Sequence, residues 1–273
     1  MILNIMLTFT IMKTPSIRLF ITVYKNTHFL KKVLDSVSAQ SYKNFKVSVL
    51  EDGDSEIMKT FISTCDYPFV LEHYSQEDIG FRKNRILNMG IRNAQEDLYV
   101  FIDGDCVLHP TYLHTYAKHF NENEVMFAKR TNLDEKTSDR ILNSSDIVPS
   151  KWEMIRNKST RVEDSFRIPF KPIFAAKKPK LLGCNMAIPK KVMWKINGFD
   201  EDYEITGYGE DSDVEWRLLK AGIVCKNFKY HSVQFHLYHE RHDREEQTAI
   251  SRAIYNKKKE EGNFFCKNGL IKS

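Results

Sequence analysis

The chain has 273 residues, of which 42% are hydrophobic and 28% charged. This composition is typical of a folded globular protein and excludes a disordered tail, a collagen-like repeat and a membrane bundle. The formal net charge of +5 falls short of the basic character of a nucleic-acid-binding protein, so nucleic acid is not an expected partner.

The five cysteines are scattered along the chain and include no Cys-x-x-Cys pair. This pattern favours buried free thiols over a disulfide framework or a zinc ribbon. The first twelve residues are apolar, but they are too short to span a bilayer and lack the basic start of a signal peptide. We expect residues 1–15 to form an N-terminal extension outside the fold, with Met12 as an alternative start of translation.

From residue 16 to residue 130, strand-like and helix-like patterns alternate. The expected strands are 17–24, 45–50, 69–73 and 98–102, and the expected helices are 27–38, 56–63 and 81–94. Buried strands that alternate with amphipathic helices predict an α/β fold, with a mostly parallel central sheet flanked by helices. Two acidic turns, 51–54 and 103–105, follow strands of this sheet, at the edge where ligands bind in open α/β sheets.

The pattern weakens after residue 130. We interpret residues 131–180 as a variable connection of helix and loop, interrupted by four prolines. Lys171–Lys195 contains seven lysines and no acid, whereas Ile196–Glu215 contains eight acids and no base. The lysine-rich stretch is either solvated surface or a face for an anionic acceptor or membrane. A helix is expected at 245–260.

The turn Asp103-Gly104-Asp105 brings two carboxylates together at the end of a buried strand. Carboxylates separated by a glycine can approach one hard divalent cation, although an isolated pattern of this kind is more commonly an ordinary acidic turn. At the start of the expected helix 81–94, Lys83 and Arg85 offer cationic donors for phosphate oxygens. A solvated helix face explains these two residues equally well when they are considered alone.

Three acids, Glu210, Asp211 and Asp213, surround the expected start of another helix. Helix capping lowers the pKa of a carboxylate there, while mutual repulsion raises it, and such a balance suits a general base. N-capping alone would account for one or two of the three. Further on, His236 and His239 are spaced for one helical face or a tight turn and could complete a metal site begun by carboxylates.

Taken in this order and spacing, the motifs resemble those of family 2 glycosyltransferases with the GT-A fold, over nearly the whole chain. The second half resembles the galactosyltransferase-like region shared by β-1,4-galactosyltransferases and chondroitin-type polymerases. The segments that carry the resemblance are Phe20–Lys25, Glu51–Gly53, Gly80–Ile91, Phe101–Asp105, Gly183–Ala187, Asn197–Glu201 and Gly207–Asp213.

The resemblance implies one GT-A domain with two halves. A nucleotide-sugar-binding half would span residues 16–130 and an acceptor-binding, catalytic half residues 181–245, followed by a C-terminal helix and tail over 246–273. The implied donor-binding residues are Val23, Tyr24, Asp52, Lys83, Arg85 and Asp103. The implied ligands of a Mn²⁺ or Mg²⁺ ion are Asp103, Asp105, His236 and His239.

On the acceptor side, the resemblance implies that Asp211 is the catalytic base, assisted by Glu210. The implied acceptor-binding residues are Asn185, Tyr208, Glu210 and Asp213. Tyr208 stands where galactosyltransferases usually carry tryptophan, and Leu87 replaces an arginine common in the family, so the identity of the sugar stays open.

The resemblance therefore implies an inverting, metal-dependent enzyme that moves a sugar from a nucleotide donor, with UDP expected, to a glycan or lipid-linked saccharide. Such an enzyme would serve surface-polysaccharide synthesis in the cytoplasm or at the inner membrane face. Two alternatives stay open. A sugar-nucleotide nucleotidyltransferase would need a glycine-rich loop after the first strand, which residues 23–28 lack. A non-catalytic binding module of the same fold would not require the three acids.

Overall fold

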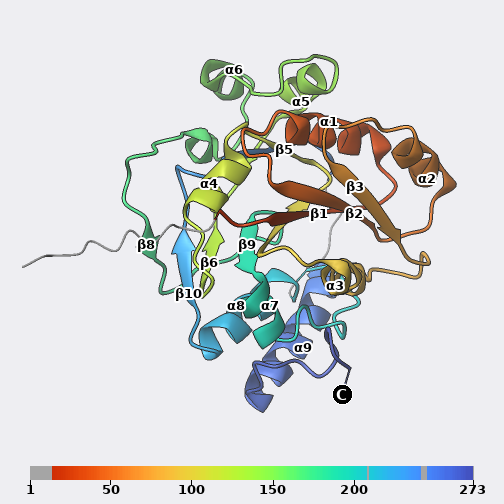
Figure 1. Ribbon diagram of the computed structural model, residues 1–273, viewed down its shortest axis with the longest axis vertical. Helices are drawn as coiled ribbons and strands as arrows, with labels where there is room; N and C mark the ends of the chain where they lie inside the picture. The colour runs from red at the N-terminus through yellow and green to blue at the C-terminus, as the bar shows by residue number, and fades with distance from the viewer. Residues whose placement is uncertain (1–13, 208, 241–244, 273) are drawn as a thin grey trace, which may run out of the picture.

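The computed structural model describes residues 14–207, 209–240 and 245–272 (Figure 1). An eight-stranded sheet runs through the molecule in the order β3-β2-β1-β4-β9-β6-β10-β8. Its first four strands are mutually parallel and are β1 (Ile17–Val23), β2 (Phe45–Glu51), β3 (Val70–Ser75) and β4 (Leu98–Asp103). The four strands expected from the first half of the sequence are thereby confirmed.

Three helices connect these strands and cover both faces of the sheet. They are α1 (Thr27–Ser38), α2 (Glu56–Ser63) and α3 (Lys83–Asn93). The Asn26 side chain caps α1 by accepting a hydrogen bond from the backbone N–H of Phe29 at 2.9 Å. Figure 1 shows α1 and α2 on one side of the sheet and α3 on the other.

The sheet separates two hydrophobic cores. Because successive residues of a strand point to opposite faces, Leu19 and Ile21 of β1 pack with α1, whereas Phe20 packs with Ile86 of α3. All of these side chains are fully buried. The near-continuous apolar pattern of β1 is explained by this burial on both faces.

The second half of the sheet is mixed, which differs from the mostly parallel arrangement of the first half. Strand β9 (Met186–Pro189) lies antiparallel between β4 and β6 (Glu124–Phe127). Strand β10 (Val224–Asn227) is parallel to β6, and the two-residue β8 (Phe174–Ala175) closes the edge antiparallel to β10. These strands have four residues or fewer, too few to leave a clear periodic pattern.

A second, three-stranded sheet positions the candidate site. Its order is β5 (Cys106–Leu108), β11 (Gln234–His236) and β7 (Thr131–Asn132). Strand β11 pairs antiparallel with β5, so that His236 lies opposite Cys106. The pairing therefore brings the histidine-rich segment to the acidic turn that follows β4.

The remaining helices lie around the two sheets. They are α4 (Tyr112–Lys118), α5 (Glu135–Leu142), α6 (Lys151–Arg156), α7 (Lys190–Lys195), α8 (Asp211–Lys220) and α9 (Glu245–Glu261), with a 3₁₀ turn at Val162–Ser165. Figure 1 shows α5 and α6 on the side of α1, and α7, α8 and α9 on the side of α3.

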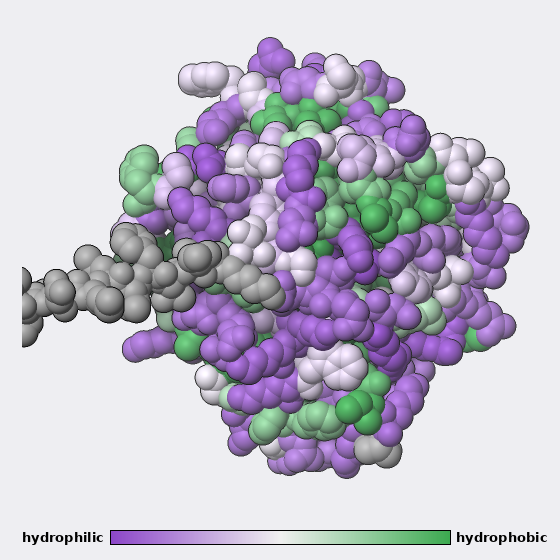
Figure 2. All heavy atoms as spheres, in the orientation of Figure 1, coloured by the Kyte–Doolittle hydropathy of each residue, from purple (hydrophilic) through white to green (hydrophobic). Residues whose placement is uncertain are grey.

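The visible surface is predominantly hydrophilic, with small separate hydrophobic areas (Figure 2). Six of the seven lysines in the stretch 171–195 are exposed and Lys190 is half-buried, so the charges of this stretch lie on the surface, although the stretch also contains the buried strand β9. Among the residues that the structure describes, no helix is both long enough and apolar enough to cross a membrane.

Candidate active site

The acidic turn after β4 begins the site. Gly104 allows the turn to pack against β1, because a Cβ atom at this position would come within 3.1 Å of Val23 Cβ and 3.2 Å of the Thr22 carbonyl oxygen. The backbone N–H of Gly104 donates to that carbonyl at 2.7 Å. The turn is thereby fixed on the sheet, with Asp103 at the end of β4 and Asp105 just before β5.

Asp105 lies within reach of two imidazoles. Its Oδ2 is 3.3 Å from His236 Nε2 and 3.4 Å from His239 Nε2. The backbone N–H of Leu237 donates to the Asp105 carbonyl at 2.9 Å, which holds the segment after β11 against the turn. Burial opposes ionisation of Asp105, but hydrogen bonds from His236 and His239 hold the pKa of its carboxyl well below the usual value.

These three side chains form a donor set suited to a divalent first-row metal ion. Their ligand atoms all lie within 4.8 Å of one another, and one carboxylate with two imidazoles suits Mn²⁺ chemically. Of the four metal ligands implied by the sequence, the structure therefore groups Asp105, His236 and His239. Asp103 lies outside this group.

The Asp103 carboxylate is surrounded by other polar groups. Its Oδ1 accepts hydrogen bonds from Thr22 Oγ1 at 2.8 Å and from Lys83 Nζ at 2.7 Å. Its Oδ2 is 3.7 Å from the guanidinium of Arg130, which follows the carboxyl end of β6. Asp103 is therefore held between two cations.

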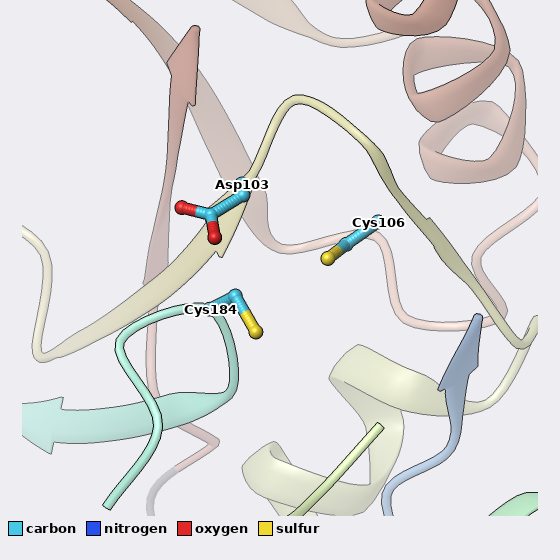
Figure 3. Close-up of side chains that lie close together, drawn as sticks. All are labelled: Asp103, Cys106 and Cys184. Carbon is cyan, nitrogen blue, oxygen red and sulfur yellow. The ribbon is translucent and has the colours of Figure 1, made fainter. Parts of the chain in front are cut away.

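Two thiols complete the surroundings of Arg130. Its Nη1 lies 3.1 Å from Cys184 Sγ and 3.8 Å from Cys106 Sγ. Figure 3 shows both sulfur atoms near the Asp103 side chain; Asp103 and Cys106 stand at the two ends of the turn between β4 and β5, and Cys184 lies in the loop before β9. Both cysteines are buried, and burial raises the pKa of the Cys106 thiol, in agreement with the expected free thiols. Sequence reasoning missed Arg130, because β6 was not predicted.

Lys83 links this region to the acids of α8. Its Nζ lies 2.7 Å from both Asp103 Oδ1 and Glu210 Oε1. A glycine at position 183 makes room for Glu210, because a Cβ atom there would come within 2.1 Å of Glu210 Oε1. Burial raises the pKa of Glu210 to about 6, against the opposing attraction of Lys83.

The raised pKa of Glu210 predicts a pH-dependent stability. Between pH 4.5 and 6 the folded protein holds this proton more tightly than the unfolded chain, so the free energy of unfolding falls as pH rises through that window. Across this window, Glu210 is expected to change the free energy of unfolding by about 2 kcal/mol. Denaturant unfolding at several pH values measures this change. In Glu210→Gln, the free energy of unfolding should no longer fall between pH 4.5 and 6 on account of this group. If the free energy of unfolding changed equally with pH in the variant and the unaltered protein, the pH dependence would not come from Glu210.

Asp211 is the first residue of α8. Together with Glu210 it lines a hollow of about 70 Å³. Phe81, Asn84 and Tyr203 line the same hollow. The backbone N–H of Gly183 lies 3.4 Å from Asp211 Oδ2. The position of Asp211 therefore leaves its carboxylate accessible to a hydroxyl in the hollow. Tyr208, an expected acceptor-binding residue, lies outside the described residues.

Asp213 differs from its expected role in acceptor binding. Its side chain is 1% exposed, and its Oδ2 is 2.7 Å from both Nε and Nη2 of Arg217. The hydroxyl of Tyr203 donates to Asp213 Oδ1 at 3.3 Å. Because both carboxylate oxygens are buried and occupied, the structure gives Asp213 a packing role beneath the hollow.

Asp213→Ala is therefore expected to act on stability. The substitution would leave the fully buried Arg217 without its carboxylate, at an expected cost of about 3–5 kcal/mol in the free energy of unfolding. Denaturant unfolding measures this cost directly. A variant of unchanged stability that had lost only acceptor binding would restore the role inferred from the sequence.

Asn185 is also buried, which corrects its expected place in a sugar or acceptor pocket. Its Oδ1 accepts hydrogen bonds from the hydroxyls of Tyr112 at 2.8 Å and Tyr116 at 2.6 Å. Its Nδ2 donates to the Lys129 carbonyl at 2.8 Å, and the residue is fully shielded from solvent. Asn185 thus fixes the loop before β9.

The expected nucleotide-binding residues lie at the carboxyl ends of β1 and β2. Val23 is buried, whereas Tyr24 is 57% exposed and offers an aromatic ring at this edge. Asp52 Oδ1 accepts a hydrogen bond from Gln76 Nε2 at 2.7 Å, and its Oδ2 accepts one from the backbone N–H of Arg82 at 2.8 Å. Asp52 thereby holds the start of α3 against the end of β2.

Arg85 does not join Lys83 beside Asp103. Two residues along a helix correspond to a rotation of about 200°. Arg85 consequently lies on the far side of α3, exposed, where it lines a different hollow with Tyr203 and Lys272. The structure thus places Lys83 at the expected donor side, and it places Arg85 elsewhere.

Comparison with known proteins identifies related sequences. Residues 19–177 match the model of a family described as glycosyl transferase family 2, and residues 170–242 match a model described as the N-terminal domain of galactosyltransferase. The hyaluronan synthase of Pasteurella multocida is 26% identical over 213 residues, covering 70% of this chain and 21% of the synthase. The chondroitin synthase of Pasteurella multocida is 23% identical over 207 residues, covering 68% of this chain and 21% of the synthase.

Solved structures show the same fold. GalNAc-T7, crystallised with UDP, GalNAc and Mn²⁺, superimposes with a TM-score of 0.64 at 13% identity, covering 89% of this chain and 48% of that one. This likeness confirms the GT-A fold expected from the motifs. The chain spans about a third or less of the length of the first curated relatives it matches, at 30%, 21% and 32%.

Proposed function

Because this chain belongs to glycosyl transferase family 2, we propose that it transfers a sugar from a nucleotide donor to a hydroxyl of a saccharide acceptor, with inversion at the anomeric carbon. The observation that carries the proposal is the arrangement of the site. The donor set of Asp105, His236 and His239 begins two residues after Asp103, and Lys83 pairs with both Asp103 and Glu210. Glu210 in turn lines the hollow with Asp211, so Lys83 connects the metal-binding turn to that hollow.

On the donor side, the exposed ring of Tyr24 and the edge formed by Val23 and Asp52 would receive the nucleoside. Lys83 and Arg130 provide positive charge beside Asp103, where the diphosphate would lie. A divalent ion, Mn²⁺ or Mg²⁺, held by Asp105, His236 and His239 would supply further positive charge to stabilise the departing diphosphate. The complex of GalNAc-T7 with UDP and Mn²⁺ supports a UDP donor.

On the acceptor side, Asp211 would act as the general base. Its carboxylate would take the proton of an acceptor hydroxyl in the hollow as the hydroxyl oxygen forms a bond to the anomeric carbon. That bond forms opposite the departing diphosphate, so one displacement converts an α-linked donor into a β-glycoside. Glu210 would bind the acceptor beside Asp211 while its ion pair with Lys83 keeps the two sides of the site together.

For the acceptor, we propose a saccharide chain of a surface polysaccharide, supported by the similarity to the two synthases. A lipid-linked saccharide at the cytoplasmic membrane face is the form of acceptor that the exposed lysines of the stretch 171–195 would favour, because their charge attracts anionic lipids.

A donor screen tests this proposal. The protein is incubated with Mn²⁺, a mixture of short saccharide acceptors and, one at a time, UDP-, GDP-, CDP- and dTDP-linked sugars, and nucleotide release is measured. We expect release from one nucleotide class, UDP, that disappears when the metal ion is chelated. Nucleotide binding without release from any donor would contradict the proposal and favour a non-catalytic binding module.

A further inference from the structure

A second hollow lies beside the proposed acceptor hollow. It has a volume of about 110 Å³, and three separate segments form its wall. Arg82 and Arg85 come from the start of α3, Tyr203 comes from the loop before α8, and Lys272 comes from the C-terminal segment. Tyr203 also lines the hollow that contains Glu210 and Asp211, so the two hollows share one wall.

Positive charge is available in this second hollow. Its buried carboxylate, Glu201, is already paired with Arg92 at 3.0 Å and with Lys272 at 3.1 Å. Its other carboxylate, Glu204, is exposed to solvent. Arg85 has no side-chain hydrogen bond or ion pair with any residue in the described part of the chain. Its guanidinium is therefore available to an external anion.

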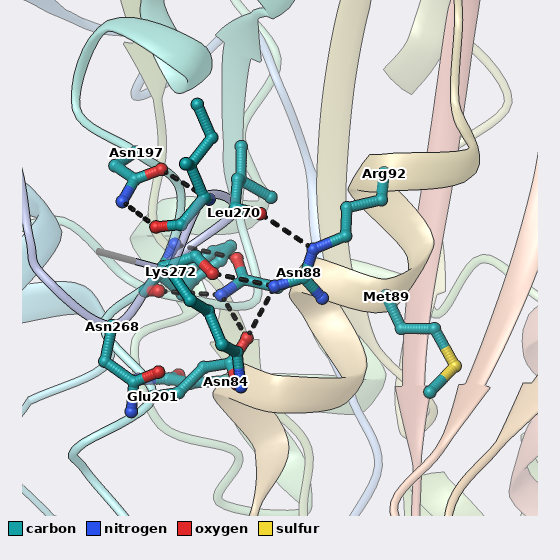
Figure 4. Close-up of polar contacts among 12 residues, drawn as sticks. Asn84, Asn88, Met89, Arg92, Asn197, Glu201, Asn268, Leu270 and Lys272 are labelled. Atoms are coloured by element: carbon teal, nitrogen blue, oxygen red, sulfur yellow. Dashed lines mark hydrogen bonds and ion pairs between the residues drawn. The ribbon is translucent and has the colours of Figure 1, made fainter.

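The C-terminal wall of the hollow is firmly built (Figure 4). Asn197 Nδ2 donates to the carbonyls of Cys266 at 2.7 Å and Ile271 at 2.8 Å, and its Oδ1 accepts from the backbone N–H of Ile271 at 2.8 Å. Arg92 donates from Nη2 to the Gly269 carbonyl at 2.7 Å. These bonds hold Lys272 at the hollow. The two family models end at residues 177 and 242, so this wall lies outside the matched regions.

We propose that this hollow binds an anionic group of the acceptor, a carboxylate or a phosphate, with Arg85 as its main ligand. The inference rests on the proposed glycosyl transfer, because it takes the neighbouring hollow as the place of the reacting hydroxyl. A guanidinium offers paired N–H donors that match both anions, while Lys272 and Arg92 offset the charge of Glu201 in the same hollow. An acceptor that presents its hydroxyl to Asp211 would extend past Tyr203 and place a charged neighbouring group at Arg85.

A binding experiment without any nucleotide tests the proposal. Three probes are titrated into the protein and followed by NMR: methyl β-glucuronide for the carboxylate, glucose 1-phosphate for the phosphate, and methyl β-glucoside as the neutral match. We expect at least one anionic probe to bind roughly tenfold more tightly than the neutral one, which corresponds to one favourable charged contact. The preferred anion identifies the source, an acidic sugar or a phosphate-linked acceptor.

Variants locate the binding. Arg85→Gln should remove the preference for the anionic probe, whereas Arg156→Gln, an exposed arginine at the end of α6 on the other side of the sheet, should keep it. A neutral probe that binds as tightly as the charged ones, or an undiminished preference in Arg85→Gln, would overturn the proposal. Because no donor is present, a failure of the donor screen would leave this result standing, and the two proposals fail separately.

Discussion

Asp105→Asn is expected to remove metal-dependent donor binding, with a loss of roughly 100-fold or more in the affinity for Mn²⁺. Asp105 is the only carboxylate in the group that it forms with His236 and His239, and its oxygen lies 3.3–3.4 Å from both imidazoles. Loss of a group that merely orients a metal ligand costs 10- to 100-fold in affinity, so loss of a ligand itself should cost at least as much. Titration calorimetry with Mn²⁺, and with nucleotide sugar in the presence and absence of Mn²⁺, measures both effects.

A matched control for this experiment is Asp54→Asn. Asp54 lies in the other acidic turn, after β2, where it is exposed and pairs with Lys59 at 2.9 Å. The same chemical change there should leave the affinities for metal and donor unchanged. If Asp105→Asn bound Mn²⁺ and donor as tightly as this control does, the metal site assigned to the turn after β4 would be wrong.

Asp211→Asn is expected to lower kcat by about 10²- to 10⁴-fold while donor affinity stays the same, because this is the usual contribution of a general base. Asparagine has nearly the same shape and can still accept the hydrogen bond from the backbone N–H of Gly183, but it cannot take a proton from the acceptor. Steady-state kinetics gives kcat, and calorimetry gives donor affinity.

The control for this substitution is Asp139→Asn, an exposed acid on α5, which lies on the other side of the sheet. We expect its kcat to equal that of the unaltered protein. Turnover of Asp211→Asn at the level of this control would exclude Asp211 as the base. A parallel loss of donor affinity would instead show that the substitution disturbed the donor side.

Local pattern was sufficient to predict the first half of the fold. The cap formed by Asn26, the amphipathic stripe of α1 and the doubly buried strand β1 are each encoded within a few neighbouring residues. The second half depends on pairing between distant, short strands. Strand β7 has two residues, and β11 pairs with β5 across more than a hundred residues, so neither leaves a periodic signal of its own.

The same division applies to the site. Residue chemistry suggested that the two histidines could complete a metal site begun by carboxylates, and the family resemblance implied Asp105 as their partner. Their meeting depends on the β5–β11 pairing, which no local pattern predicts. Asn185 and Asp213 are polar residues that suit a binding role chemically, but packing buries both of them, and burial is a tertiary property. The separation of Arg85 from Lys83, in contrast, follows from helix geometry and could have been predicted from their spacing.

The stereochemistry of the product tests the central proposal most directly. In this account the metal-binding side and Asp211 act on one anomeric carbon from opposite faces in a single displacement. NMR of the saccharide formed from an α-linked nucleotide sugar measures the coupling constant of the new anomeric proton. We predict a β-glycoside. An α-glycoside would contradict the account, because retention of configuration cannot arise from a single displacement with Asp211 as the base.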